Sequence, residues 1–458
     1  MSAVSAGADG TETRKATAGF AAATAISYRE CKGCGRMNAV EALPEGSAAR
    51  CDRCNTVLRT ARRNPVNRTL AFALSALALF SVATFTPLLT MSISGQQITA
   101  DLTTGSLQLD KQGFWVLGVL VGLTTILAPA ARLATSCYVL MALRMTRPPM
   151  HLAPVFRWTA RLKPWSMIEV YLLAIFVAYA KLVDMAQVEV GIAVIAFAGV
   201  MVAMIAADLA LDPDVVWEAI DRRERAAALL PQERPGKGAV GCECCGFVST
   251  PAPASHAAAC PRCGSPLHHR KPDSIARAWA LATAAIVLYI PANLYPVMTV
   301  VSLGRGAPDT IMSGVIELAH AGMWPLALLV FFASITVPVL KLLALIYLLV
   351  TTQLGSAKHL RRRTVMYRLV EGIGRWSMID IFMISILVGL VRLGNLATIE
   401  PGIGAISFAG VVILTMFAAE CFDPRLMWDA AEATHPTRSP TKAPERPSPG
   451  SAHTSSTA

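Results

Sequence analysis

Eight long apolar runs dominate the hydropathy pattern of this 458-residue chain. A helix needs ~20 mostly apolar residues to cross a bilayer. Stretches such as 191–205 are apolar on every side, whereas a buried helix of a soluble protein keeps a polar face at helical period. We therefore predict eight transmembrane helices, at 68–91, 113–143, 165–187, 190–210, 276–301, 322–352, 376–394 and 402–421.

The second half of the chain repeats the first half. The segment Trp165-Ser-Met-Ile-Glu169 recurs as Trp376-Ser-Met-Ile-Asp380, and the same spacing aligns other positions of the two halves. Internal self-similarity of this length indicates a duplicated structural unit. Because each copy contains four spans, both copies insert with the same topology, as a parallel repeat.

The placement of basic residues orients the predicted helices. The formal net charge of +11 would suggest nucleic acid binding in a soluble protein. Here, however, the basic residues gather in segments that must share one side of the membrane, among them Arg144, Arg157 and 361–363, while the loops on the other side carry chiefly Lys111 and Arg305. By the positive-inside rule, both termini and both cysteine clusters lie in the cytoplasm. No nucleic acid partner is expected.

Two sets of four cysteines precede the two groups of spans. Paired C-x-x-C turns bring four sulfurs to one tetrahedral metal ion, most commonly zinc, with each site closed by protein ligands. Disulfides are the competing interpretation, which a cytoplasmic location disfavours. A rubredoxin-like iron site or a redox dithiol also fits four sulfurs, and Cys244 could replace a neighbouring ligand. The predicted ligands are Cys31, Cys34, Cys51 and Cys54 in the first set and Cys242, Cys245, Cys260 and Cys263 in the second.

These patterns predict an all-α polytopic membrane protein with two parallel four-helix repeats and two small cytoplasmic zinc-ribbon domains. The predicted segments are an unstructured start (1–25), zinc ribbon 1 (26–64), transmembrane unit 1 (65–211), a linker (212–239), zinc ribbon 2 (240–271), transmembrane unit 2 (272–424) and an unstructured tail (425–458).

Ionisable residues inside the predicted spans suggest function, because charge is costly in hydrocarbon. In unit 2, Lys341 is predicted to pair with Asp380, flanked by hydroxyl groups that Ser334, Ser377 and Thr415 provide. A buried lysine can lose its proton near neutral pH, so this group is a candidate proton-linked network. Structural ion pairs that fix helix register are the alternative.

Unit 1 carries the equivalent pair, Arg132 and Glu169, with Met204 where unit 2 has Thr415. Arginine is effectively always charged. The first pair is therefore predicted to be a static intramembrane strut. Charged residues near span ends, namely Lys181, Asp184, Arg392 and Asp208, are explained by anchoring at the membrane interface.

The tandem C-x-x-C ribbons, the two four-span units and the repeated Trp-Ser-Met-Ile-[Asp/Glu] motif resemble the paraquat-inducible protein A family over about 26–430. This resemblance implies a non-enzymatic subunit of the bacterial inner membrane that loads or extracts phospholipids for a periplasmic MCE-domain tunnel protein. It also implies zinc at the eight cysteines and a proton-coupled network at Ser334, Lys341, Ser377, Asp380 and Thr415. The chain has no Walker motif.

Two other functions remain in view. A redox or metal-responsive membrane protein would use the four-cysteine sites as sensors or electron carriers, and a small-molecule exporter would use the spans alone. Metal identity separates the first alternative from lipid transport. Co-purification with a periplasmic partner carrying phospholipid separates the second.

Overall fold

The structure is a computed structural model, and it describes residues 27–93, 96–145, 151–183, 187–224, 235–236, 238–250, 258–302, 305–391 and 397–434. The predicted unstructured start, 1–25, and the anchoring residues Asp184 and Arg392 lie outside these residues.

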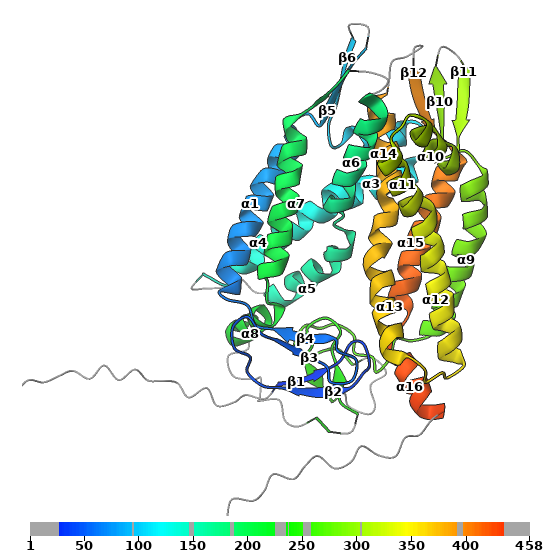
Figure 1. Ribbon diagram of the computed structural model, residues 1–458. Coiled ribbons are helices and arrows are strands. Elements are labelled where there is room, and N and C mark those ends of the chain that lie inside the picture. The colour runs from blue at the N-terminus through cyan, green and yellow to red at the C-terminus, as the bar shows by residue number, and fades with distance from the viewer. Residues whose placement is uncertain are drawn as a thin grey trace, which may run out of the picture.

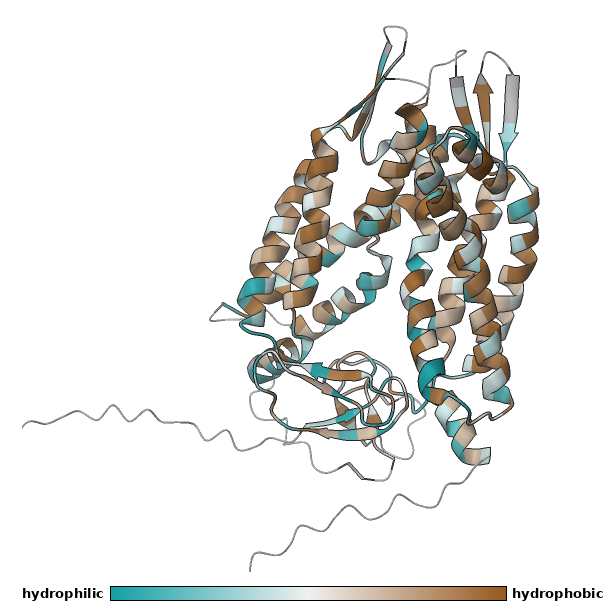
Figure 2. Cartoon of the chain, viewed as in Figure 1, coloured by the Kyte–Doolittle hydropathy of each residue, from teal (hydrophilic) through white to brown (hydrophobic). Residues whose placement is uncertain are grey.

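Within the described residues, eight helical segments are long and apolar enough to cross a membrane, which confirms the predicted number. They form two bundles of four (Figure 1), and hydrophobic residues predominate along these helices (Figure 2). Four of the eight segments are divided by a π-helical or 3-10 turn, labelled η. The segments are α1 (Pro65–Phe85); α3 (Trp115–Gly122), η1 (Leu123–Leu127) and α4 (Ala128–Ala142); α5 (Leu152–Leu162), η2 (Lys163–Trp165) and α6 (Ile168–Val183); α7 (Ile192–Ala210); α9 (Ser274–Leu294); α11 (Trp324–Phe331), η3 (Phe332–Thr336) and α12 (Val337–Gln353); α13 (Leu360–Ile373), η4 (Gly374–Met378) and α14 (Ile379–Leu390); and α15 (Ile403–Cys421).

Several predicted span boundaries were wrong. The predicted spans 165–187 and 376–394 begin too late, because the basic helices α5 and α13 lead directly into them. In α5, Phe156 is buried while Arg161 lies in the last turn, so a polar face and an apolar face share one short helix. Such a helix suits the boundary between headgroups and hydrocarbon.

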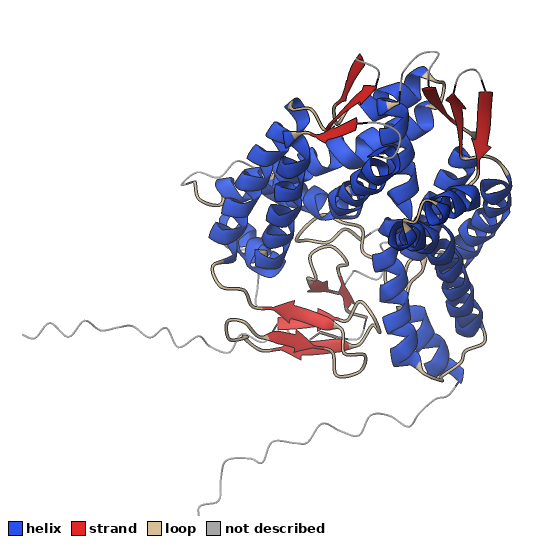
Figure 3. Ribbon diagram, turned by 45° about the horizontal axis from the view of Figure 1, so that its top comes forward, coloured by secondary structure: helices blue, strands red, loops and turns tan. Residues whose placement is uncertain are grey.

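A small antiparallel sheet caps each unit at the end that we call the strand side (Figure 3). The predicted spans 68–91 and 276–301 ran into the first strands of these sheets, since β-branched apolar strands continue the hydropathy of the helix before them. The sheet orders are β6-β5-β7 and β11-β10-β12. The elements on this side are β5 (Leu89–Ile93), β6 (Gln96–Ala100), α2 (Thr104–Lys111), β7 (Gln187–Val190), β10 (Met298–Ser302), β11 (Arg305–Asp309), α10 (Ile311–His320) and β12 (Ala397–Pro401).

The two units meet through equivalent helices, α6 of unit 1 and α14 of unit 2. At this contact the rings of Tyr171 and Phe382 lie edge to face, with centroids 5.5 Å apart. Helix α2 of unit 1 also packs against α14. Every residue of α14 is therefore buried, which places this helix in the centre of the molecule.

The four-cysteine domains lie at the opposite end, which we call the cysteine side. We refer to residues 27–61 as the first cysteine domain and to residues 238–270 as the second. Their strands are β1 (Ser27–Glu30), β2 (Met37–Val40), β3 (Ala48–Arg50), β4 (Val57–Thr60), β8 (Val240–Gly241) and β9 (Val248–Ser249).

The predicted linker and the predicted unstructured tail both contain a helix on this side. The predicted linker 212–239 includes α8 (Pro213–Glu224), and the predicted tail 425–458 includes α16 (Arg425–Thr434). Each helix buries a tryptophan, Trp217 in α8 and Trp428 in α16. The burial of these large rings against the cysteine domains orders both segments.

The cysteine domains are exchanged between the halves of the chain. The first domain packs its cysteines on Tyr367, Phe422 and Trp428 of the second half, and the second packs its cysteines on Leu140, Phe156 and Trp217 of the first half. The contacts between arginine and tryptophan follow the same exchange, whereas Arg29 and Arg59 of the first domain form ion pairs with Asp214 of α8 in their own half. Arg53 lies over the Trp428 ring at 4.4 Å, and Arg262, its counterpart in the repeat, lies 6.0 Å from the Trp217 ring.

A buried ion cluster centred on Arg425 joins the two domains. Arg425 is 4% exposed and contacts Glu30 of the first domain at 3.2 Å, Glu243 of the second at 2.7 Å and Asp423 at 2.9 Å. Burial raises the pKa of Asp423, but the hydrogen bonds and charge of Arg425 outweigh burial and leave that pKa below its usual value. The carboxylate is therefore held ionised beside the guanidinium.

The exchange of the cysteine domains predicts that two tryptophan substitutions have opposite effects on the two domains. Trp428→Ala should expose the first cysteine domain (27–61) to limited trypsin digestion, while Trp217→Ala should expose the second (238–270), because each ring supports the domain from the other half. The lost packing and cation–π contact is worth about 1–3 kcal/mol locally. Mass spectrometry of the first cleavage products measures this, and each variant is the control for the other. Cleavage in the domain of the same half would contradict the exchange.

Candidate functional site

Each cysteine domain brings four sulfurs to one point. In the first, Cys31 Sγ and Cys54 Sγ are 3.4 Å apart, and Cys34 Sγ and Cys51 Sγ are 3.6 Å apart. All four sulfurs of a set lie within 4.8 Å of one another and are buried. Sulfurs bound at ~2.3 Å to one tetrahedral ion lie roughly 3.8 Å apart, so the spacing fits a metal ion.

The second domain has the same geometry, with Sγ separations of 3.5 Å for Cys242 and Cys263 and 3.6 Å for Cys245 and Cys260. These separations exceed the ~2.05 Å of a disulfide bond, and none of the cysteines is in a disulfide. Cys244 is not among the four clustered sulfurs; it is half-buried and lines a separate cavity. The four expected ligands of each set are therefore brought together.

Broken helices position the polar residues of unit 2. Ser334 lies in the π-helical turn η3, and Pro338 follows four residues later. Proline has no N–H group, so it cannot donate to the Ser334 carbonyl one turn earlier. Ser377 lies in the 3-10 turn η4, directly before α14, which carries Asp380. The turns η3 and η4 pack against each other, which brings the three side chains into one region.

Lys341 does not form the predicted ion pair with Asp380. Its amine instead donates to Thr415 Oγ1 at 3.0 Å. A Cβ atom added to Gly374 would lie 2.8 Å from the Lys341 amine, so this glycine leaves the space that the lysine tip occupies. Gly374 precedes Asp380 by six residues, and the lysine side chain therefore points toward the cysteine side rather than toward the carboxylate.

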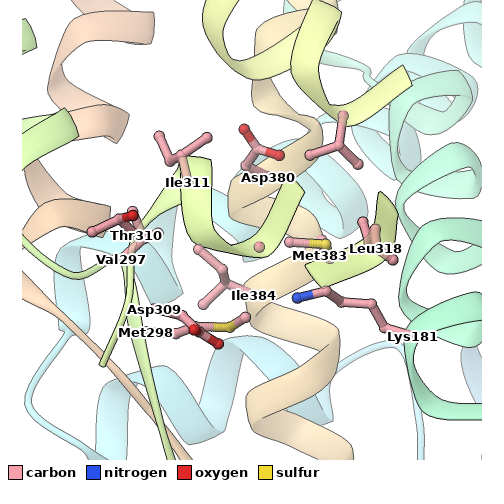
Figure 4. Close-up of a pocket in the computed structure, with 12 residues that line it drawn as sticks. Lys181, Val297, Met298, Asp309, Thr310, Ile311, Leu318, Asp380, Met383 and Ile384 are labelled. Carbon is pink, nitrogen blue, oxygen red and sulfur yellow. The ribbon is translucent and has the colours of Figure 1, made fainter. Parts of the chain in front are cut away.

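Asp380 is buried at 4% exposure, and three polar atoms around it have no hydrogen-bond partner in the described structure: Asp380 Oδ2, Ser334 Oγ and Ser377 Oγ. A cavity of about 30 Å³ adjoins Asp380 and reaches Asp309, Thr310 and Lys181 (Figure 4). A cavity of this volume can hold a water molecule. Most of its lining surface is apolar, and Lys181, Asp309, Thr310 and Asp380 are the polar residues beside it. The cavity leads from Asp380 toward the strand side.

Unit 1 also departs from its predicted pairing. Arg132 forms an ion pair with Asp208 rather than with Glu169, and Lys163 lies 3.2 Å from the same carboxylate. Asp208, which the sequence explained as an interface anchor, is thus the half-buried centre of a charge group that joins buried Arg132 to exposed Lys163. The sequence did contain a signal for this ion pair. Asp208 lies two residues before the end of α7, at a depth that the long side chain of Arg132 reaches.

Glu169 lines a large cleft between the two units. The cleft has a volume of about 790 Å³ and is bounded by α6 and α7 of unit 1 and by Leu329 and Trp376 of unit 2. It extends along α6 from Glu169 to Tyr179 and reaches Leu89 on the strand side. Apart from Glu169, Tyr179 and Trp376, its lining is aliphatic or phenyl side chains, so the cleft suits a long apolar ligand.

Comparison with known proteins gives one consistent result. The family model for paraquat-inducible protein A matches residues 66–221 and 275–432. Intermembrane transport protein PqiA of Escherichia coli (strain K12) is 34% identical over 411 residues, which cover 87% of this chain and 95% of that protein. Lipophilic envelope-spanning tunnel protein A of the same strain is 32% identical over 406 residues, with 89% and 92% covered.

A probable intermembrane transport protein of Haemophilus influenzae is 28% identical over 407 residues, with 88% and 95% covered. No solved structure matches the chain. The family match spans both membrane units and more than half of the chain, in agreement with the resemblance seen in the sequence. The chain therefore belongs to the paraquat-inducible protein A family.

Proposed function

We propose that this protein is a bacterial inner-membrane subunit that loads or extracts phospholipids for a periplasmic MCE-domain tunnel protein, and that proton movement through unit 2 is coupled to the transport. The names of its relatives, an intermembrane transport protein and an envelope-spanning tunnel protein, support a role between membranes. It acts by binding and moving lipid, not by catalysis.

The cleft between the units is the observation that carries the proposal. A volume of about 790 Å³ with an almost wholly apolar lining accommodates acyl chains. The cleft lies beside the α6–α14 contact, so a tilt of one unit against the other changes its width. The lipid thereby passes along α6 between Glu169 and the strand side.

The buried groups of unit 2 suit proton coupling better than a static ion pair. Lys341 and Asp380 are both buried and do not neutralise each other. A lone charge is costly in hydrocarbon, whereas a lysine or an aspartate becomes neutral by exchanging a proton. The water-sized cavity next to Asp380 gives protons from the strand side access to the network.

Orientation and partner follow from the charge pattern. The basic segments place the cysteine side in the cytoplasm and the strand side in the periplasm. The MCE-domain partner then binds on the strand side, where the outer strands β6 and β11 offer unpaired edges within the described sheets. The two metal sites, which we assign to zinc, hold the cytoplasmic domains folded.

Affinity purification of the tagged chain from native membranes tests this proposal. The chain should retain the MCE-domain protein and phospholipid, both identified by mass spectrometry. Leu172→Trp places a larger side chain in the cleft and should lower the retained phospholipid several-fold. Ile205→Trp, at an exposed position of α7, is the control and should not. Equal phospholipid retention in both variants would contradict the assignment of the cleft as the lipid-binding site.

A second expectation concerns the network. Lys341→Met, Asp380→Asn and Thr415→Met should each lower transport by about tenfold or more, because each removes a group that holds or passes the proton. Complementation of a deletion strain reports function, and an immunoblot of membranes confirms insertion. Thr125→Val, which removes the hydroxyl that unit 1 carries at the position equivalent to Ser334, is the matched control and should keep activity. Variants that accumulate and still complement would contradict proton coupling.

Metal content gives a third expectation. The purified chain should hold two zinc ions, Cys51→Ala and Cys260→Ala should each hold one, and Cys244→Ala should keep both. Elemental analysis measures the zinc. Iron with a visible absorption band would instead favour the redox function.

A further inference from the structure

Unit 1 contains a second cavity at its cysteine side, with a volume of about 260 Å³. Helices α1, α4, α5, α7 and α8 and the turn η2 bound it, and each cysteine domain contributes one residue, Lys32 from the first and Cys244 from the second. Neither the cleft nor the polar network of unit 2 includes any of these residues.

Basic residues predominate among the charged residues of the lining, although Lys32 and Lys163 are also exposed at the surface. Lys32, Arg132 and Lys163 are its cations, and Asp208 is the only carboxylate among the lining residues, so the cavity carries two more positive than negative formal charges. Arg132 and Lys163 share the Asp208 carboxylate, while the Lys32 amine donates to the Glu243 carbonyl oxygen at 2.7 Å. All three cations retain further N–H groups that an acceptor in the cavity can take.

One buried hydroxyl also indicates a ligand. Thr69 is 3% exposed and lines the cavity, and its Oγ1 has no hydrogen-bond partner among the residues that the structure describes. A buried hydroxyl left without a partner costs about 1–3 kcal/mol. An acceptor in the cavity satisfies it, and the surrounding positive charge favours an anionic one.

The equivalent place in unit 2 supports a functional reason for these residues. The repeat aligns Thr69 with Ala278, Ser136 with Leu345, Lys163 with Gly374 and Asp208 with Ala419. Each of these four polar residues of unit 1 is therefore replaced by an apolar residue at the equivalent position of unit 2, where Ala278 and Leu345 are fully buried. Since unit 2 builds the same helix arrangement without these polar groups, the fold does not require them.

The cavity lies at headgroup depth. Thr69 is the fifth residue of α1 counted from the cysteine side, and Asp208 is the third from the end of α7. At 1.5 Å per residue both lie within ~6 Å of the helix ends. The polar layer on each face of a bilayer is about 5–7 Å thick, so the cavity lies where phospholipid phosphates lie.

We propose that this cavity binds the phosphate group of a phospholipid from the leaflet on the cysteine side. Arg132, Lys163 and Lys32 donate to the phosphate oxygens, and the Thr69 hydroxyl completes the site. Free phosphate has the same binding chemistry but lacks acyl chains, so the two sources are separable. Because phosphate binding is measured without transport, the result tests this site separately from the proposed transport function.

The test uses the full-length chain in a phosphate-free, non-ionic detergent. Short-chain phosphatidylglycerol, inorganic phosphate and short-chain diacylglycerol are titrated separately, and thermal unfolding reports binding. Phosphatidylglycerol should raise the midpoint saturably, inorganic phosphate should need at least about tenfold higher concentration, and diacylglycerol should not saturate the site.

Variants locate the binding. Lys163→Gln should weaken phosphatidylglycerol about tenfold, and Thr69→Ala, which introduces the residue of unit 2, should weaken it several-fold while folding normally. Lys111→Gln, at an exposed position on the strand side, is the control for charge and should bind as the wild type does. Unchanged affinity in the Thr69 and Lys163 variants, or equal affinity for inorganic phosphate and lipid, would overturn the proposal.

Discussion

The cysteine domains are too small to bury cores of their own, and this constraint organises the molecule. Each domain has only short strand pairs, and its buried cysteines pack on helices from the opposite half of the chain. Arg425 then joins both domains through Glu30 and Glu243. The two bundles are consequently tied at the cysteine side by exchanged domains and at the centre by the α6–α14 contact. A motion of one unit relative to the other therefore also has to move or deform the two cysteine domains.

Sequence patterns predicted what depends on composition and spacing. The eight spans follow from hydropathy, and the two clusters of four cysteines follow from the C-x-x-C spacing, which fixes the sulfurs locally. The exchange of the cysteine domains could not be predicted, because a repeat has the same pattern whether its domains pack on their own half or on the other. The predicted ion-pair partners of two side chains were wrong for a related reason. Lys341 and Arg132 are long and flexible, so helix position alone does not choose between Asp380 and Thr415, or between Glu169 and Asp208.

The duplication has produced two different units. Helices α7 and α15 are equivalent, yet α7 carries Met204 and Asp208 where α15 carries Thr415 and Ala419. These positions are one turn apart, so the polar residue lies deep in the membrane in unit 2 and near the helix end in unit 1. Lys163 and Gly374 differ in the same sense: the lysine adds charge near the surface in one copy, and the glycine makes room for a buried lysine in the other. A common scaffold thus places charge at two depths.

The exchange also sets the order in which the protein can be completed during synthesis. The first cysteine domain leaves the ribosome before any span is made, but Trp428, on which its Arg53 rests, is among the last of the described residues to be translated. At ~5–20 residues per second, the domain waits on the order of tens of seconds without its packing surface. A metal ion bound early would hold it folded through this interval, and the whole chain becomes a closed structure only when its final helix, α16, arrives.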